Sequence, residues 1–233
     1  AIEQADAIMI LNRFGEDRFD LIMQASKARI PVFVDKPFTM NLDEAEQLVE
    51  TYNKLQIPLF STSVFRFSKE VQDLKTELEQ TEWLGGSVIG PATCKDLGND
   101  PRLNKLHFYG IHLAEILQEV FGSGVESVQA LKSDTGFHSL VQKTDGAQIG
   151  LLMLDPMDDY YSIEVYTSNG VRSVTIDLEG DFYIDSMMAF LKFVNGDNGV
   201  SPKKTLEALE LMFAIEKTIG KTIIGRMSLI LIK

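Results

Sequence analysis

The first 63 residues contain one pattern twice, and this repetition constrains the fold more than any other feature of the chain. An apolar run at 7–11 precedes a segment of helical periodicity at about 17–28, and a second apolar run follows at 32–35. A second helical segment begins after Asn41 and leads to a third apolar run at 59–61. Short, continuously apolar runs are typical of strands buried on both faces of a parallel sheet. The alternation therefore predicts three parallel strands joined by two helices.

Residues at the ends of these segments agree with that arrangement. Asn41 can cap the second helix, and Glu44 occupies the third position after it. Pro31 and Pro58 each stand at the start of a strand, where a missing N–H costs little.

Three such strands form only half of a doubly wound dinucleotide-binding sheet. The phosphate-binding turn, G-x-G-x-x-G, would belong to the other half, and the sequence contains no convincing match to it. Residues 85–90 are rich in glycine, but a strand-like run and a proline accompany them rather than a helix, so we interpret this stretch as a turn. Because the chain also begins without Met, we expect it to be the later part of a protein of about 300 residues.

After residue 63 the pattern changes to that of an α+β domain. Helical segments are expected at 68–79, 109–121, 186–194 and 201–219. Strands are expected at 125–131, 139–143, 147–154, 161–167 and 171–178. Asp145-Gly146 and Asn169-Gly170 are typical hairpin turns, so the strands should form an antiparallel meander. The sequence thus predicts an α/β part, 1–65, followed by an α+β domain with an open, mainly antiparallel sheet, 66–233.

Charge and cysteine content exclude several classes of partner. The chain holds 22 basic and 34 acidic residues, and its net charge of −12 repels nucleic acid and anionic bilayers. No window approaches the roughly 18 uninterrupted apolar residues of a membrane span. The single cysteine, Cys94, excludes an intrachain disulfide and indicates a reducing compartment, and the three histidines lack metal-ligand spacing. We expect a cytoplasmic protein that binds no nucleic acid, membrane or metal.

Lys36 is a candidate catalytic residue because of its place after the second strand. Ligands of open parallel sheets bind at the carboxyl ends of the strands, and Asp35-Lys36-Pro37 lies at that edge. The Lys36 ammonium could bind a substrate hydroxyl or help to move its proton, and a cis Lys36–Pro37 bond would fix its direction. The alternative is a solvated lysine in a strand-to-helix turn.

His112 lies within an apolar helix and could serve as a general base. On the residues alone, a hydrogen-bonded core histidine is the more common explanation. Tyr109 and Glu115 share its side of the helix and could orient it.

Polar residues also follow the first and third strands. Asn12 and Arg13 end the first, and Ser61, Ser63 and Arg66 follow the third. Such residues can surround a hydroxylated ligand, although solvated loops are the more common cause of this polarity.

Several of these segments together resemble one family. The run Ala7–Leu11, then Val32–Pro37, Arg66-Phe67, Tyr109-Gly110-Ile111-His112 with Glu115, and Thr205-Leu206-Glu207 are similar to the Gfo/Idh/MocA oxidoreductases, named for glucose-fructose oxidoreductase and inositol dehydrogenase. The resemblance covers nearly the whole chain. It implies the later half of a Rossmann-type sheet and an NAD(P)-dependent dehydrogenase that acts on a sugar, inositol or related polyol.

The resemblance also implies roles for individual residues. Lys36 would contact the reacting hydroxyl, His112 would take part in proton transfer, and Tyr109 would assist them. The cofactor, NAD or NADP, would lie against Asn12, Arg13, Asp35, Lys36 and Pro37, with Asp35 near the nicotinamide ribose. The substrate would contact Arg66, Lys36, Tyr109 and His112. The later sheet would join copies of the chain into a dimer or tetramer.

One position departs from the common pattern of the family. Many members have Asp four residues before the histidine, whereas this chain has Phe108. Two alternatives to a dehydrogenase stay open. Phe108 favours the first, a catalytically inactive sugar-binding or regulatory protein. The second is an NAD-dependent redox glycosidase, which shares the motifs.

Overall fold

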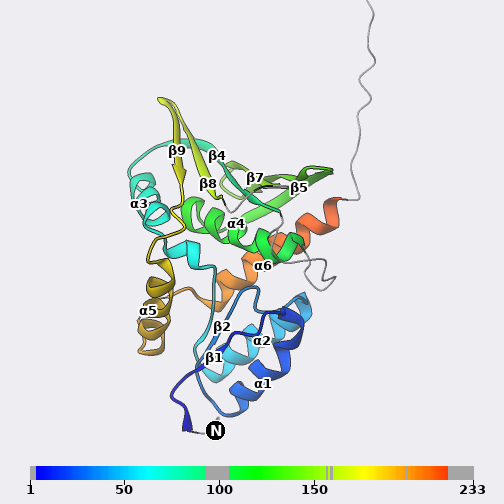
Figure 1. Ribbon diagram of the computed structural model, residues 1–233, viewed down its shortest axis with the longest axis vertical. Coiled ribbons are helices and arrows are strands. Elements are labelled where there is room, and N and C mark those ends of the chain that lie inside the picture. Colours follow the sequence, from blue (N-terminus) through cyan, green and yellow to red (C-terminus); the bar gives the residue numbers. More distant parts are fainter. Residues whose placement is uncertain (1–3, 93–104, 156, 158–159, 198, 220–233) are drawn as a thin grey trace, which may run out of the picture.

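The computed structural model describes residues 4–92, 105–155, 157, 160–197 and 199–219. The chain forms a three-stranded sheet near its N-terminus and a six-stranded sheet farther along, with helices between and around them (Figure 1). Cys94 lies outside the described residues. Among the described helices, none has both the length and the apolar composition that crossing a bilayer requires.

The first sheet confirms the repeated pattern. It consists of β1 (Ile8–Ile10), β2 (Val32–Val34) and β3 (Leu59–Ser61), all parallel and in that spatial order. The connecting helices are α1 (Phe19–Lys27) and α2 (Leu42–Leu55). Asn41 caps α2 as expected, because its side chain accepts a hydrogen bond from the backbone N–H of Glu44.

Both faces of the first sheet are covered, which explains its continuously apolar strands. Val32, Val34 and Leu59 belong to the core that includes α1 and α2. On the other face, Phe33 of β2 and Phe60 of β3 pack against Phe190 of α5 (Phe182–Val194), with ring centroids 5.6 and 5.7 Å from it.

The second sheet is open and mainly antiparallel, but it is not one continuous meander. Its spatial order is β5 (Val125–Ser133), β6 (Gly136–Lys143), β7 (Gln148–Leu154), β4 (Trp83–Pro91), β8 (Ser162–Thr167) and β9 (Gly170–Thr175). β4 separates β7 from β8, and it pairs parallel with β7 and antiparallel with β8. The expected meander is therefore wrong at this point, because a strand from earlier in the chain occupies the centre of the sheet.

The interpretation of residues 85–90 as a turn is also wrong. These residues lie inside β4, and the glycines serve close packing rather than chain reversal. A Cβ atom on Gly86 would overlap the ring of Phe121 and the backbone oxygen of Glu164. The glycine allows the C-terminal end of a helix to approach the centre of the sheet.

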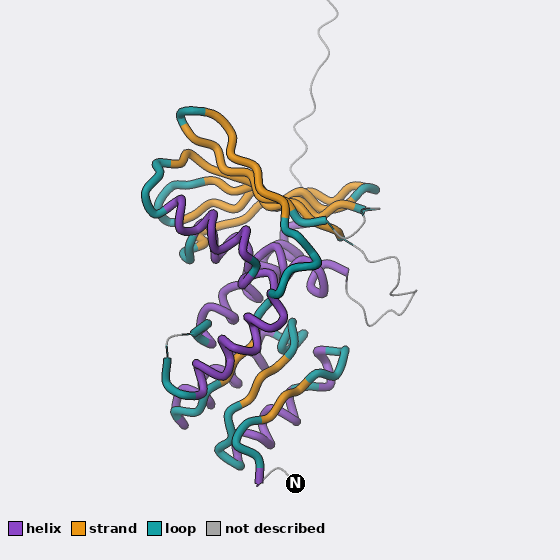
Figure 2. Tube along the Cα trace, turned by 60° about the vertical axis from the view of Figure 1, so that its left-hand side comes forward, coloured by secondary structure: helices purple, strands orange, loops and turns teal. Residues whose placement is uncertain are grey.

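Helices cover one face of the second sheet and leave the other open (Figure 2). The covering helices are α3 (Lys69–Leu78), α4 (Lys105–Phe121) and α6 (Pro202–Ile219).

Two short 3₁₀ helices, η2 (Gly15–Asp17) and η3 (Val64–Phe67), follow the ends of β1 and β3. Ser68 caps α3, since its side chain accepts a hydrogen bond from the backbone N–H of Val71. Helices α4 and α5 begin four residues earlier than the sequence indicates.

Candidate active site

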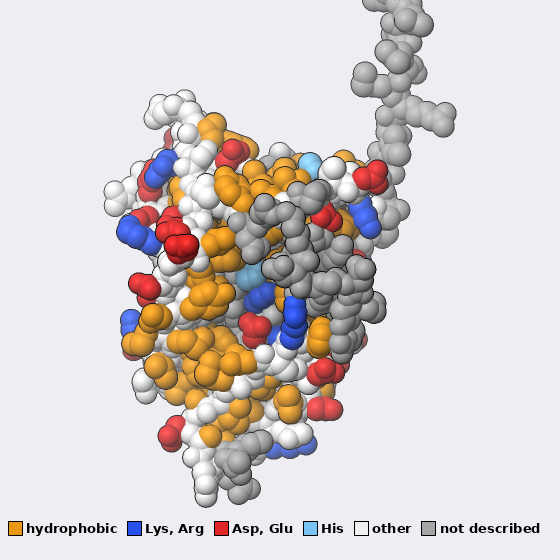
Figure 3. Space-filling view, in the orientation of Figure 1, with side chains coloured by type: hydrophobic (Ala, Val, Ile, Leu, Met, Phe, Trp, Pro, Cys, Tyr) orange, Lys and Arg blue, Asp and Glu red, His pale blue; other side chains and the backbone are white. Residues whose placement is uncertain are grey.

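The register of the first sheet brings three strand ends to one edge. Ile10, Val34 and Ser61 lie side by side, so the residues that follow them are neighbours. A pocket of about 460 Å³ opens at this edge, between the two sheets. It is lined by Asp35, Lys36, Val64, Phe65, Tyr109, His112, Tyr161, Leu178, Phe182 and Tyr183. Figure 3 shows histidine, basic and acidic side chains close together in the middle of this face of the molecule.

Lys36 lies between β2 and the start of α4. The Lys36–Pro37 bond is cis, as the sequence suggested. Lys36 Nζ donates to the backbone oxygen of Phe108 at 3.1 Å and lies 4.0 Å from the centre of the Phe108 ring. Burial lowers the pKa of Lys36 to about 8, although the nearby carboxylate of Asp35 opposes this shift. The amine can therefore gain and lose a proton near neutral pH.

His112 is buried in the wall of the same pocket. Its Nδ1 lies 2.6 Å from Ser63 Oγ. Its ring packs against the rings of Phe65 and Tyr161, with centroids 4.9 and 5.9 Å apart. Burial, followed by the positive charge of Lys36, holds the pKa of His112 well below its ordinary value. The imidazole is therefore neutral at physiological pH.

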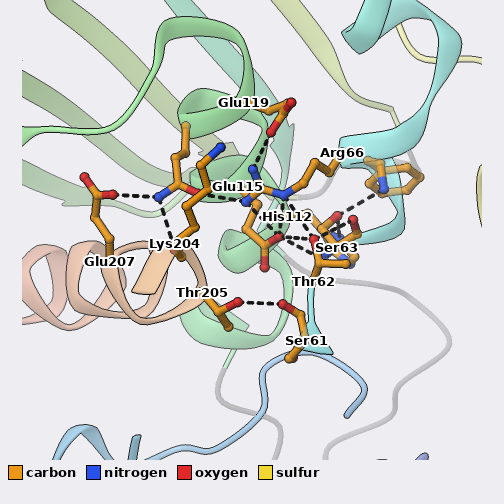
Figure 4. Close-up of polar contacts among 12 residues, drawn as sticks. Ser61, Thr62, Ser63, Arg66, His112, Glu115, Glu119, Lys204, Thr205 and Glu207 are labelled. Atoms are coloured by element: carbon orange, nitrogen blue, oxygen red, sulfur yellow. Dashed lines mark hydrogen bonds and ion pairs between the residues drawn. The ribbon is translucent and has the colours of Figure 1, made fainter. Parts of the chain in front are cut away.

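A buried ion pair supports this wall from behind. Arg66 Nη2 lies 3.1 Å from Glu115 Oε2, and both side chains are about 1% exposed. The same carboxylate oxygen accepts hydrogen bonds from Thr62 Oγ1 at 2.6 Å and from the backbone N–H of Ser63 at 2.8 Å (Figure 4). Glu115 thus connects α4 to the segment that follows β3.

Glu119, one turn farther along α4, completes the cluster. Its carboxylate contacts Arg66 Nη1 at 2.7 Å and Lys75 Nζ of α3 at 2.6 Å. Burial alone would raise its pKa, but Arg66 and Lys75 together lower the pKa to about 2. The charged carboxylate therefore holds η3, α3 and α4 together.

Helix α6 joins the same region through Thr205 and Glu207. Thr205 Oγ1 donates to the backbone oxygen of Ser61 at 2.7 Å. Glu207 accepts from Gln118 Nε2 at 2.8 Å and from the backbone N–H of Gly124 at 2.6 Å. These contacts fix the end of β3 against both long helices (Figure 4).

Arg18 fixes the ends of β1 and β2 and was missed in the sequence. Its guanidinium is fully buried and donates to the backbone oxygens of Asn12, Asp35 and Pro37. The residue lies between a 3₁₀ helix and α1, where arginine is usually solvated. No local signal distinguishes it, because its acceptors lie at the ends of two different strands.

The structure brings together only some of the residues singled out in the sequence. Asp35, Lys36, Tyr109 and His112 line the pocket, whereas Asn12, Arg13, Pro37 and Arg66 do not. Arg66 is occupied by the two carboxylates of α4. The aromatic walls formed by Tyr161 and α5 were missed, because they come from segments far from the motifs in the chain. Among the described residues, no group of three His, Cys, Asp or Glu side chains could hold a metal ion.

Residues 2–62 match the model of a family described as an oxidoreductase family with an NAD-binding Rossmann fold, Gfo/Idh/MocA. The chain is 24% identical over 135 residues to a myo-inositol 2-dehydrogenase of Thermotoga maritima. That alignment covers 54% of this chain and 39% of the relative, so the match spans well under half of the relative's length.

Solved structures show the same fold over most of the chain. A probable dehydrogenase of Thermotoga maritima has a TM-score of 0.77 at 19% identity, covering 94% of this chain and 81% of that one. An oxidoreductase of Agrobacterium radiobacter in complex with NAD⁺, L-tartaric acid and magnesium has a TM-score of 0.76 at 17% identity, covering 93% and 78%. Residues 2–62 are thus similar to the NAD-binding Rossmann part of the Gfo/Idh/MocA oxidoreductases, and the solved structures share the fold of most of the chain.

Proposed function

We propose that the protein is an NAD(P)-dependent dehydrogenase that oxidises a CH–OH group of a sugar, an inositol or a related polyol. The observation that carries this proposal is the meeting of Lys36 and His112 in one pocket, at the carboxyl ends of the strands of an NAD-binding fold. The similarity to a myo-inositol 2-dehydrogenase supports the substrate class.

The residues at the strand ends fit a nicotinamide dinucleotide. Asn12 Oδ1 is buried and has no hydrogen-bond partner among the described residues, so it can accept from an amide or hydroxyl of the cofactor. The Asp35 side chain is 41% exposed beside the pocket and can accept from a ribose hydroxyl. Arg13 is exposed after β1, and Pro37 is buried after Lys36. When bound, the cofactor would supply the hydride acceptor.

Lys36 and His112 would bind the oxygen of the reacting CH–OH group from two sides. One of the two also exchanges its proton, while Phe108 O holds the Lys36 ammonium in place. Tyr109 lies beside both and can bind a neighbouring hydroxyl. The rings of Phe65, Tyr161 and Phe182 exclude water and offer flat apolar surfaces to the C–H faces of a sugar ring.

A sugar-binding protein without catalysis is the second candidate, and Phe108 favours it. The Phe108 ring lies against Lys36 at the position where many family members carry Asp. Saturable sugar binding without cofactor oxidation would support this candidate. Cleavage of an aryl glycoside would instead support an NAD-dependent redox glycosidase.

The proposal extends to the organisation of the whole protein. Residues 1–65 would form the cofactor side, and residues 66–233 would form the substrate side and the contact between copies in a dimer or tetramer. The face of the second sheet that none of the described helices covers would make this contact. A cytoplasmic location is part of the proposal and rests on the single cysteine.

Titration of NADH and NADPH into the full-length protein tests the cofactor assignment. We expect saturable binding of at least one of them, and turnover with a sugar or polyol that Lys36→Ala abolishes. Lys54→Ala, at the exposed end of α2, is the matched control and should leave turnover unchanged. Absence of cofactor binding would contradict the proposed function, and turnover that survives Lys36→Ala would remove the role of the lysine.

A further inference from the structure

The contact between Ser63 and His112 determines which ring nitrogen carries the proton. Ser63 is fully buried at the start of η3, and its Oγ accepts from the backbone N–H of Phe65 at 3.2 Å. Its second partner is His112 Nδ1 at 2.6 Å. The Ser63 hydroxyl has one proton to donate, and Nδ1 is its acceptor among the described residues.

Buried polar groups are nearly always hydrogen-bonded, so this proton should be used. If Ser63 donates to Nδ1, every group in the contact is satisfied and the proton of the neutral imidazole lies on Nε2. If Nδ1 carried the proton instead, the Ser63 hydroxyl would accept twice and leave its own proton buried without an acceptor. The first arrangement therefore costs less.

We propose that Ser63 holds His112 as a neutral hydrogen-bond donor with its proton on Nε2, so that Lys36, rather than His112, exchanges the proton of the substrate. This inference rests on the proposed function and specifies the chemistry of the same site. His112 Nε2–H then donates to the reacting oxygen and stabilises the negative charge that develops on it.

The buried ion pair behind the pocket keeps Ser63 in position. Glu115 accepts from the backbone N–H of Ser63 at 2.8 Å, and its charge is balanced by Arg66. Because Glu115 Oε2 is occupied by these partners and by Thr62, it holds the Ser63 backbone rather than contacting the imidazole. Ser63, Glu115 and Arg66 are thus positioning residues that act through His112.

Lys36 is suited to the proton exchange. A bound oxidised nicotinamide would accept the hydride from the carbinol carbon, and the neutral Lys36 amine would accept the hydroxyl proton and become an ammonium. Burial brings the pKa of Lys36 to about 8, so the amine is partly neutral near physiological pH. The other titratable groups around His112 are Asp35 after β2, Tyr161 before β8, and Tyr109 and Glu115 on its own helix.

The protonation state can be measured without cofactor or substrate. In full-length protein with isotope-labelled histidine nitrogens, NMR distinguishes a protonated Nδ1 from a protonated Nε2, and only His107, His112 and His138 contribute. We expect His112 to be neutral and protonated on Nε2 at neutral pH. Ser63→Thr keeps the hydroxyl and should keep this signature, whereas Ser63→Ala should move the proton partly to Nδ1.

Ser68→Ala is the matched control, because Ser68 is also buried and also caps a helix, yet its hydroxyl bonds Val71 N–H and not the histidine. It should leave the His112 signature unchanged. Wild-type protein with the proton on Nδ1, or a Ser63→Ala variant with an unchanged signature, would overturn the proposal. If Ser63→Ala does not fold, the position of the His112 ring proton in wild-type protein and in Ser63→Thr still tests the proposal.

A kinetic measurement then connects the tautomer to turnover. With a substrate that is turned over, kcat should fall by about 100-fold in Ser63→Ala, the usual cost of one lost preorganised donor, and Ser63→Thr should recover most of it. The affinity for the cofactor should stay the same in both variants. Unchanged kcat in Ser63→Ala would contradict the role of Ser63, and absent cofactor binding in wild-type protein would instead contradict the proposed function.

Discussion

Lys36 owes its properties to the groups immediately around it. Its ammonium has one backbone acceptor, Phe108 O, and an aromatic ring, but the surrounding burial disfavours the charge. A solvated lysine would remain protonated at physiological pH, and it could bind an oxygen without taking a proton from it. Burial is therefore what makes proton exchange available at this position.

The pH dependence of oxidation should reflect this residue. Because only the neutral amine accepts a proton and its pKa is lowered to about 8, kcat/KM for oxidation should rise with pH and level off above about 8. Steady-state rates across this range provide the measurement. Lys36→Arg keeps the charge but cannot lose its proton, so it should abolish the rise. A profile without change between pH about 7 and 9 would argue against this assignment.

Arg18 illustrates a residue whose role depends on several backbone oxygens at once. Its planar guanidinium reaches Asn12, Asp35 and Pro37, all beside the candidate site. Lysine has a single ammonium and cannot satisfy these acceptors in the same geometry.

Arg18→Lys should therefore destabilise the protein by about 1–3 kcal/mol, since buried carbonyl groups lose their donors. Urea denaturation of wild-type protein and variant measures the difference. Arg29→Lys is the control, because that guanidinium is exposed and donates to a single backbone oxygen, that of Leu55, in the described part of the chain. Equal stability of Arg18→Lys and wild-type protein would show that the stability of the strand ends does not depend on the hydrogen bonds of Arg18.

At the scale of elements, helix α4 carries residues of the candidate site and also contacts that position them. Tyr109 and His112 line the pocket, and Glu115 and Glu119 contact Arg66 farther along the helix. The helical repeat of 3.6 residues brings all four to one face, because residues three to four apart are neighbours on the helix surface. One helix thus carries both the candidate chemistry and the contacts that hold it against η3 and α3.

The Glu119 contacts should make folding stability dependent on acid pH. The pKa of this carboxyl is lowered to about 2 in the folded protein, so its contribution is complete above pH about 4.5 and disappears as the pH falls toward 2. A shift of this size corresponds to about 3–4 kcal/mol. Denaturation at a series of pH values should show that the free energy of unfolding falls less at acid pH in Glu119→Gln than in wild-type protein. The same dependence of stability on pH in both proteins would refute this contribution.

The position of β4 depends on its glycines. Gly86 lies beneath the Phe121 ring, and any side chain there would separate α4 from the sheet. Gly86→Ala should cost at least about 1–3 kcal/mol, the range for overpacking a core. Thermal unfolding compares it with Ser87→Ala in the same strand, which adds no atoms. A Gly86→Ala protein as stable as that control would contradict the close approach described for β4.

At the scale of the whole molecule, the two sheets are covered differently. The first sheet has helices on both faces, whereas the described helices cover only one face of the second (Figure 2). The open face carries several exposed apolar side chains, namely Leu84, Leu131, Leu140, Tyr166 and Val171. Contiguous apolar surface of this kind is typical of contacts between proteins.

Leu140→Glu should therefore shift the protein toward monomers, because it places a charge in the middle of the proposed contact between copies. Leu140 is 46% exposed and lies on β6. Sedimentation velocity over a range of concentrations measures the assembly. Leu191→Glu, on the exposed side of α5, should leave the assembly unchanged. A wild-type protein that is monomeric at all concentrations would rule out this contact.

Much of the architecture follows from local pattern. The structure contains the three buried strands, the two helices between them, the cap at Asn41 and the hairpin glycines Gly146 and Gly170 where the sequence places them. Each depends on backbone geometry or periodicity within a few residues. Lys36 and His112 were found for a related reason, since a strand end and a helix face locate them.

Only the tertiary structure decided the remaining features. The insertion of β4 between β7 and β8, the clamp formed by Arg18 and the bond between Ser63 and His112 join residues far apart in the chain, 49 positions apart for the last pair. Such contacts depend on how finished elements pack, and local propensity carries no information about them. The sequence by itself determined the repeated strands and helices of the first sheet, whereas packing placed residues 85–90 in a strand and determined which of the polar residues meet.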